Sequence, residues 1–131
     1  MVRPDVNAKF APVAACVLEP NAFRESDFVA TRGEFAAYYD NDSLRVQLIY
    51  DHYGSSVRIA PPDNRTQYFD ISLVLSYLTD DTVNDPPVEQ VAQLFSEHYA
   101  AIIALFGKCD ASWAAFEQWL DAFNRKRFKT W

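Results

Sequence analysis

The sequence predicts a single α+β domain over residues 1–131. We expect an N-terminal helix, a three- to four-stranded antiparallel meander sheet, and then three helices packed on one sheet face. Three observations lead to this prediction. The chain has 131 residues, half of them hydrophobic, which is enough for one core. Apolar residues alternate with period two in the middle of the chain, and they recur with helical spacing on both sides of it.

The N-terminal helix is indicated by apolar residues from Phe10 to Leu18 that recur three or four positions apart. Asn7 is placed to cap this helix. Pro12 fits only near the first turn, because proline lacks the N–H that later turns need. The helix is expected to end at residues 20–21, Pro-Asn.

The sheet is predicted between about residues 28 and 61. Side chains expected to face the core alternate with side chains expected to face away from it in residues 34–39, 44–51 and 56–60, as in half-buried strands. Asp-Asn-Asp-Ser at 40–43 and His-Tyr-Gly at 52–54 are typical of turns. Residues 68–69 fit a fourth, short edge strand. We expect Phe35, Leu44, Val46, Leu48, Val57 and Ile59 to face the helices.

Three helices are expected after the sheet. Asp70 or Ser72 starts a short one, and a polar loop follows over residues 79–87. Helical spacing then predicts one long, largely buried helix to residue 106, with Pro87 in its first turn and Gly107 in the left-handed position after its end. Asp110 or Ser112 caps a last helix, whose predicted buried face is Trp113, Phe116, Leu120 and Phe123.

The charge distribution favours a basic protein partner. The formal net charge is −6 and the pI is about 4.7. Four of the 12 basic residues (Arg125, Lys126, Arg127 and Lys129) lie near the C-terminus, so the rest carries eight basic against 18 acidic groups, a net of −10. Such a chain repels nucleic-acid phosphates and attracts basic protein surfaces. Phe128 and Trp131 interleave with the basic residues, but we interpret this segment as a helix end stabilised by cations.

Several classes of site are disfavoured by composition. Three glycines, far apart, exclude a glycine-rich phosphate cradle. Cys16 and Cys109 form no CxxC motif, and we expect them to be free and buried, with a single disulfide as the alternative. The N-terminal apolar run is too short to cross a bilayer. We therefore expect a cytoplasmic protein with no cofactor, no nucleic acid and no membrane partner.

Three short motifs touch on catalysis or metal binding. Asp51-His52, followed by Tyr53, places a carboxylate beside a histidine, but adjacent strand residues point to opposite faces. Glu97-His98 lacks the second histidine of the HExxH zinc motif. Asp40-Asn41-Asp42 begins like a calcium loop, yet arginine stands where that loop needs glycine. We interpret all three as structural and expect no enzyme.

Two surfaces are candidates for binding a partner. One is the acidic loop that carries Asp80, Asp81 and Asp85. The other is the sheet face opposite to the predicted core. It carries Tyr38, Arg45, Gln47 and Arg58, and tyrosine and arginine are the residue types enriched at interface hot spots.

The order of the elements resembles a known group of proteins. A leading helix is followed by GEFAAYYDNDSLRVQLIYDHYGSSVRIAP, a short YFDISLVLSYL helix, a long helix ending in ALFG, and an aromatic helix. This organisation is similar to small bacterial immunity proteins of polymorphic-toxin and contact-dependent competition systems. The resemblance implies a protein that binds and occludes one cognate toxin. The alternatives are an acidic secretion chaperone and a small enzyme that uses His52 or His98.

Overall fold

The computed structural model describes residues 2–128, without the side chains of residues 127 and 128. It has a five-stranded antiparallel meander sheet in the order β1-β2-β3-β4-β5. The strands are Arg24–Thr31 (β1), Glu34–Asp40 (β2), Arg45–Asp51 (β3), Gly54–Ala60 (β4) and Phe69–Asp70 (β5). The α+β fold class predicted from the sequence is confirmed, with more strands than the three or four expected.

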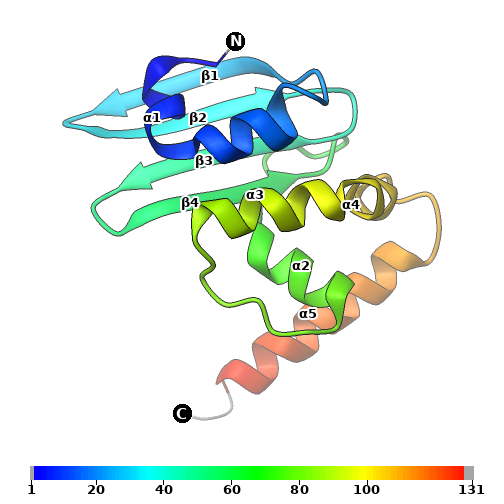
Figure 1. Cartoon of the computed structure of the whole chain (residues 1–131). Coiled ribbons are helices and arrows are strands. Elements are labelled where there is room, and N and C mark those ends of the chain that lie inside the picture. Colours follow the sequence, from blue (N-terminus) through cyan, green and yellow to red (C-terminus); the bar gives the residue numbers. More distant parts are fainter. Residues whose placement is uncertain (1, 129–131) are drawn as a thin grey trace.

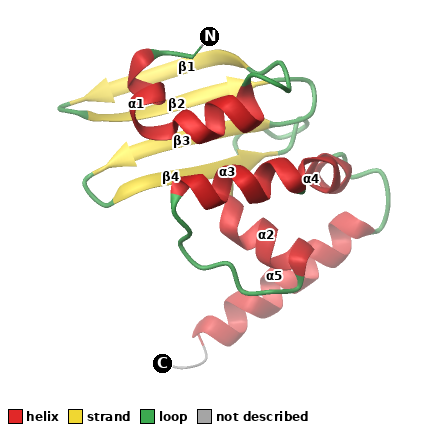
Figure 2. Ribbon diagram, viewed as in Figure 1, coloured by secondary structure: helices red, strands yellow, loops and turns green. Residues whose placement is uncertain are grey.

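The helices lie on one side of the sheet. They are α1 (Pro4–Val13), η1 (Ala14–Leu18), α2 (Ile71–Thr79), α3 (Val88–Glu97), α4 (Tyr99–Phe106) and α5 (Ser112–Phe128). Figure 1 shows α1 in front of the sheet and α3 beside β4, with α2 and α5 beyond β4 and farther from the viewer. Figure 2 shows the same layers by type of element. The six side chains predicted to face the helices are all buried: Phe35, Leu44, Val46, Leu48, Val57 and Ile59.

The N-terminal helix starts earlier than predicted. Pro4 is its first residue and Arg3 precedes it, so the prediction that Asn7 caps the helix is wrong. The backbone leaves helical geometry at Phe10, with φ −132° and ψ 27°. Pro12 explains this bend, because its ring would clash with the carbonyl four residues earlier in a straight helix. The helix then continues into η1, a π-helix that buries Val17 and Leu18.

Strand β1 was not predicted as a separate strand. Seven of its eight residues are exposed and only Phe28 is half-buried. Its side chains therefore show no alternation of apolar and polar types. Pairing with β2 makes it a strand, and that pairing includes an irregularity between Glu25 and Asp27.

The predicted long helix of residues 88–106 is two helices. His98 has φ −104° and ψ 11°, which ends α3 and starts α4 in a new direction. No proline or glycine lies at this point, so local sequence does not cause the bend. Tertiary contacts favour it, because Tyr99 accepts a 2.9 Å hydrogen bond from Asn41 Nδ2. Pro87 immediately precedes α3 instead of lying within its first turn.

The predicted caps of α2 and α5 are confirmed, whereas the predicted left-handed residue after α4 is not. Asp70 caps α2 by accepting a hydrogen bond from Ser72 N, and Asp110 does the same for Ser112 N before α5. The left-handed residue after α4 is Lys108 (φ 56°), so the prediction for Gly107 is wrong. Gly107 keeps right-handed helical geometry (φ −69°), and a Cβ there would make a tight 3.3 Å contact with the Ile103 carbonyl oxygen.

The two cysteines are free, as predicted, but both are exposed. The prediction that they are buried is wrong. Cys16 lies on the solvent side of η1, because the neighbouring Val17 and Leu18 occupy the core, and Cys109 lies in the connection after α4. The predicted buried face of α5 is also only half correct. Phe116 is fully buried, whereas Phe123 is 37% exposed because α5 extends past the core.

Candidate functional site

The sheet face turned away from the helices brings together four of the predicted partner-binding residues. In the strand register, Tyr38 lies opposite Gln47, and Gln47 lies opposite Arg58. Arg45 precedes Gln47 by two residues on β3, so it lies on the same face. We call this surface the outer face and define it by Val29, Ala36, Tyr38, Arg45, Gln47, Ile49 and Arg58.

Gln47 is the buried residue of the outer face. Its side chain is buried, with 7% of the residue exposed, and its Nε2 donates a 3.3 Å hydrogen bond to the Tyr38 hydroxyl. Its Oε1 is buried and has no hydrogen-bond partner among the described residues. Tyr38 is half-buried and Arg58 is exposed. A partner on this face would therefore contact Tyr38 and Arg58 directly.

Arg45 is engaged inside the fold. Its Nε and Nη2 donate to the two carboxylate oxygens of Asp40 at 2.9 and 3.0 Å, and Arg65 Nη1 lies 3.0 Å from the same carboxylate. Burial alone would raise the pKa of Asp40, but the hydrogen bonds and charges of the two guanidinium groups outweigh it and lower this pKa. The hydrogen bond to Asp40 likewise raises the pKa of Arg45.

This ion-paired cluster also fixes the segment before β5 against the sheet. Arg45 Nη1 lies 3.4 Å from the Tyr68 hydroxyl, and the Tyr68 ring meets the Tyr38 ring edge-on at 6.4 Å. Arg65 Nη2 donates to the Asn41 carbonyl at 2.9 Å. Sequence reasoning missed Arg65 and Tyr68 as members of this cluster, because they lie in an irregular segment 20 and 23 residues from Arg45.

An apolar row crosses the outer face beside Tyr38. Val29 lies opposite Ala36, which lies opposite Ile49. Val29 is 55% exposed, which is unusual for a large apolar side chain in this chain. Val29 could not be found from the sequence, because its strand lacks alternation of apolar and polar residues. The row supplies apolar area next to the polar hot-spot residue types, as protein interfaces do.

The acidic loop between α2 and α3 presents Asp80, Asp81 and Asp85 to solvent. Val83 anchors the loop: its N–H donates a 2.9 Å hydrogen bond to Ser76 Oγ, and its side chain packs on the core. Asp85 shares a shallow hollow with Ser56 of β4 and Asp70 of β5. Asp85 therefore borders the outer face, whereas Asp80 and Asp81 lie at the end of α2.

The segment from β5 to α4 carries unbalanced negative charge. From Thr66 to Gly107 the chain has six carboxylates and neither lysine nor arginine. None of these carboxylates forms an ion pair with the side chains described up to residue 126, whereas Arg3, Arg45, Arg65, Lys108 and Arg125 each pair with a carboxylate elsewhere. The six are Asp70, Asp80, Asp81, Asp85, Glu89 and Glu97.

The Asp51 and His52 side chains bond to different partners and not to each other. His52 Nδ1 lies 3.2 Å from Glu34 Oε2, and the His52 backbone N–H donates to the same oxygen at 3.0 Å. Asp51 instead accepts a hydrogen bond from the Tyr53 N–H. The histidine side chain is 71% exposed, so the site does not exclude water. Glu34, from β2, was not anticipated because the hairpin register alone brings it there.

The other two motifs lie at a helix bend and in a turn. Glu97 accepts a hydrogen bond from Gln93, one turn earlier, and His98 lies at the bend between α3 and α4. Asn41 Oδ1 accepts hydrogen bonds from Ser43 N and Leu44 N, which confirms a turn at residues 40–43. Within the described residues, no three histidine, cysteine or carboxylate side chains come together as metal ligands.

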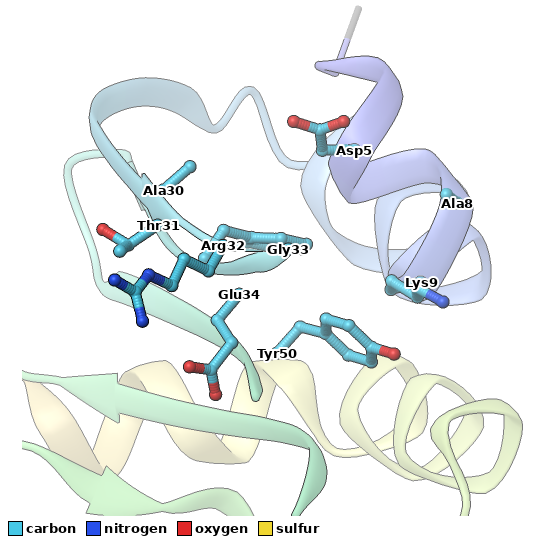
Figure 3. A pocket seen from close by; sticks show the side chains of 10 residues that line it. Asp5, Ala8, Lys9, Ala30, Thr31, Arg32, Gly33, Glu34 and Tyr50 are labelled. Atoms are coloured by element: carbon cyan, nitrogen blue, oxygen red, sulfur yellow. The ribbon is translucent and has the colours of Figure 1, made fainter. Parts of the chain in front are cut away.

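A hollow between α1 and the β1–β2 hairpin contains four charged side chains (Figure 3). Lys9 Nζ lies 4.4 Å from the centre of the Tyr50 ring, and Figure 3 shows the Arg32 guanidinium on the opposite side, directed away from α1. Asp5 and Glu34 are likewise separated across the hollow. These groups do not converge on one ligand position.

The basic C-terminal segment is described only in part. Arg125 pairs with Asp121 one turn earlier on α5, and Lys126 is exposed. Lys129 and Trp131 lie outside the described residues, and the side chains of Arg127 and Phe128 are not described. None of the helices in residues 2–128 combines the length and apolarity needed to cross a membrane.

Comparison with known proteins adds no relative. The chain matches no protein-family model, no curated protein and no solved structure.

Proposed function

We propose that this protein binds and blocks a basic partner protein in the cytoplasm, as an immunity protein blocks its cognate toxin. The observation that carries the proposal is the unbalanced charge of residues 66–107. Six carboxylates without a lysine or arginine produce a negative field around this segment. Such a field accelerates encounter with a positively charged surface and disfavours nucleic acid and acidic proteins.

The outer face supplies the contact area in this proposal. Tyr38 and Arg58 are accessible there, and the row of Val29, Ala36 and Ile49 provides apolar area beside them. Asp85 borders this surface through Ser56, so one partner can touch both the outer face and part of the acidic loop. Inhibition would follow because a bound domain covers the partner's functional surface.

The test begins with affinity capture of the tagged protein from lysate of its source organism. We expect one stoichiometric partner, identified by mass spectrometry, that is retained at moderate salt and loses its own activity when bound. The purified pair then allows variants to be compared. Tyr38→Ala with Arg58→Ala should weaken binding at least tenfold, as expected for hot-spot residues.

A charge-matched pair of variants tests the electrostatic part. The acidic-loop variant replaces Asp80, Asp81 and Asp85 by asparagine and should slow association several-fold at low salt. The control replaces three exposed carboxylates elsewhere by amides, at Asp5, Glu19 and Asp42, with the same change in net charge. Equal slowing by both variants, or the absence of any retained partner, would overturn the proposal. No contact among the described residues specifically favours the chaperone or the enzyme.

A further inference from the structure

Strand β1 forms the long free edge of the described sheet. Figure 1 shows it along one side of the sheet, and the strand at the other side, β5, has only two residues. Residues 24–27 and 29–31 are exposed. An exposed edge of this length offers unpaired backbone groups to a second strand and favours association. A protein with such an edge needs a feature that blocks it.

The register identifies which backbone groups of β1 point outward. The β1–β2 hairpin turns through Arg32 and Gly33, with φ of 54° and 83°, and Thr31 lies opposite Glu34. In a two-residue hairpin of this type the closing pair is hydrogen-bonded, and hydrogen-bonded pairs alternate along the strands. Ala30 and Phe28 fall on the non-bonded positions. Their N–H and C=O groups therefore point away from β2.

The Asp27 carboxylate accepts a hydrogen bond from one of these two outward N–H groups. The Phe28 N–H donates a 2.8 Å hydrogen bond to Asp27 Oδ1. The carboxylate also places a negative charge at the edge, next to the irregularity between Glu25 and Asp27. At the start of the strand, Arg3 holds Glu25 through two hydrogen bonds of 2.8 and 2.7 Å. An added strand would have to displace the Asp27 carboxylate to pair with Phe28.

We infer that Asp27 prevents the β1 edge from pairing with the β1 edge of a second copy of this chain. Asp27 acts by capping the outward Phe28 N–H and by placing a carboxylate on each of the two edges that would meet. This inference concerns the fold and does not depend on the proposed function. Strands in globular proteins commonly protect edges with charges and bulges, and Asp27 combines a charge with a direct hydrogen bond to the backbone.

The test is sedimentation equilibrium of purified Asp27→Ala. Each of the two related strands gains one free donor, and one net hydrogen bond is worth roughly a factor of five. The self-association constant is therefore expected to rise about 25-fold over the natural protein. Asp27→Asn keeps an acceptor but loses the charge, so it should rise less. Asp42→Ala, in the exposed β2–β3 turn, is the control with the same change in net charge.

Ala30→Pro shows whether the association uses this edge. Proline at position 30 removes an outward N–H and leaves the bonds to β2 intact, as edge strands tolerate. Association of Asp27→Ala that disappears when Ala30→Pro is added supports the inference. Association that persists in the double variant, or an Asp27→Ala constant equal to that of Asp42→Ala, overturns it. If Asp27→Ala does not fold, the comparison of Asp27→Asn with Asp42→Asn decides in the same way.

Discussion

Two phenylalanines on α5 allow a controlled test of how this helix is held. Phe116 is fully buried, and its ring centre lies 5.5 Å from Phe69, 5.1 Å from Tyr77 and 5.5 Å from Trp113. Phe123, two turns later, is 37% exposed and stacks on Trp119 at 5.4 Å. The same change to alanine at both positions therefore differs in burial and not in chemistry or secondary structure.

The expected costs differ about fourfold. Removing a buried phenylalanine side chain destabilises a protein by about 3–5 kcal/mol. Alanine favours the helix more than phenylalanine does, which offsets this loss by about 0.5 kcal/mol at each position. We therefore expect Phe116→Ala to lower the free energy of unfolding by about 4 kcal/mol, and Phe123→Ala by about 1 kcal/mol.

Urea unfolding measures both values. With a slope of about 1.5 kcal/mol per molar urea, Phe116→Ala should shift the midpoint by about 2–3 M and Phe123→Ala by less than about 1 M. Tryptophan fluorescence follows α5 directly, because Trp113 and Trp119 are in the same aromatic cluster. Far-UV circular dichroism follows the whole fold. Equal midpoints for the two variants would refute the placement of Phe116 in the core.

Three further predictions concern the sheet and its turns. Arg45 and Arg65 hold the pKa of Asp40 below its ordinary value, so the ionised carboxylate stabilises the fold fully above about pH 5, and this stabilisation is lost as the pH falls through and below about 3.8. The Asp40→Asn variant should be less stable than the natural protein at pH 7, and it should lose less stability between pH 5 and 3, as measured by thermal unfolding. Asn41→Ala should cost about 2–4 kcal/mol in urea unfolding, because Asn41 joins its own turn to the Asn21 carbonyl and the Tyr99 hydroxyl, and Asn41→Asp should keep the acceptor half of that network. Gly33→Ala should cost about 1 kcal/mol through its φ of 83° alone, since no atom lies within 4 Å of an added Cβ; a loss above about 3 kcal/mol would show an unseen contact.

The sequence determined the main layer of the fold. The period-two pattern of β2, β3 and β4 assigns Phe35, Val46 and Ile59 to the core, because successive strand residues point to opposite faces. The same pattern fixes Tyr38, Gln47 and Arg58 on the outer face. Asp70 as a helix cap and the turn at residues 40–43 follow from local hydrogen-bonding chemistry, which needs only neighbours in sequence.

Only the tertiary structure decided the features that depend on distant partners. β1 is a strand because β2 pairs with it, and its exposed side chains leave no pattern to detect. The bend at His98 follows the contact between Tyr99 and Asn41, which are 58 residues apart. Arg45 is a predicted partner-binding residue, and only the tertiary structure shows that its guanidinium pairs with Asp40 and shares that carboxylate with Arg65. Side-chain type and spacing cannot show such sharing, because the energy of a charged group depends on which opposite charge the folded chain brings within reach.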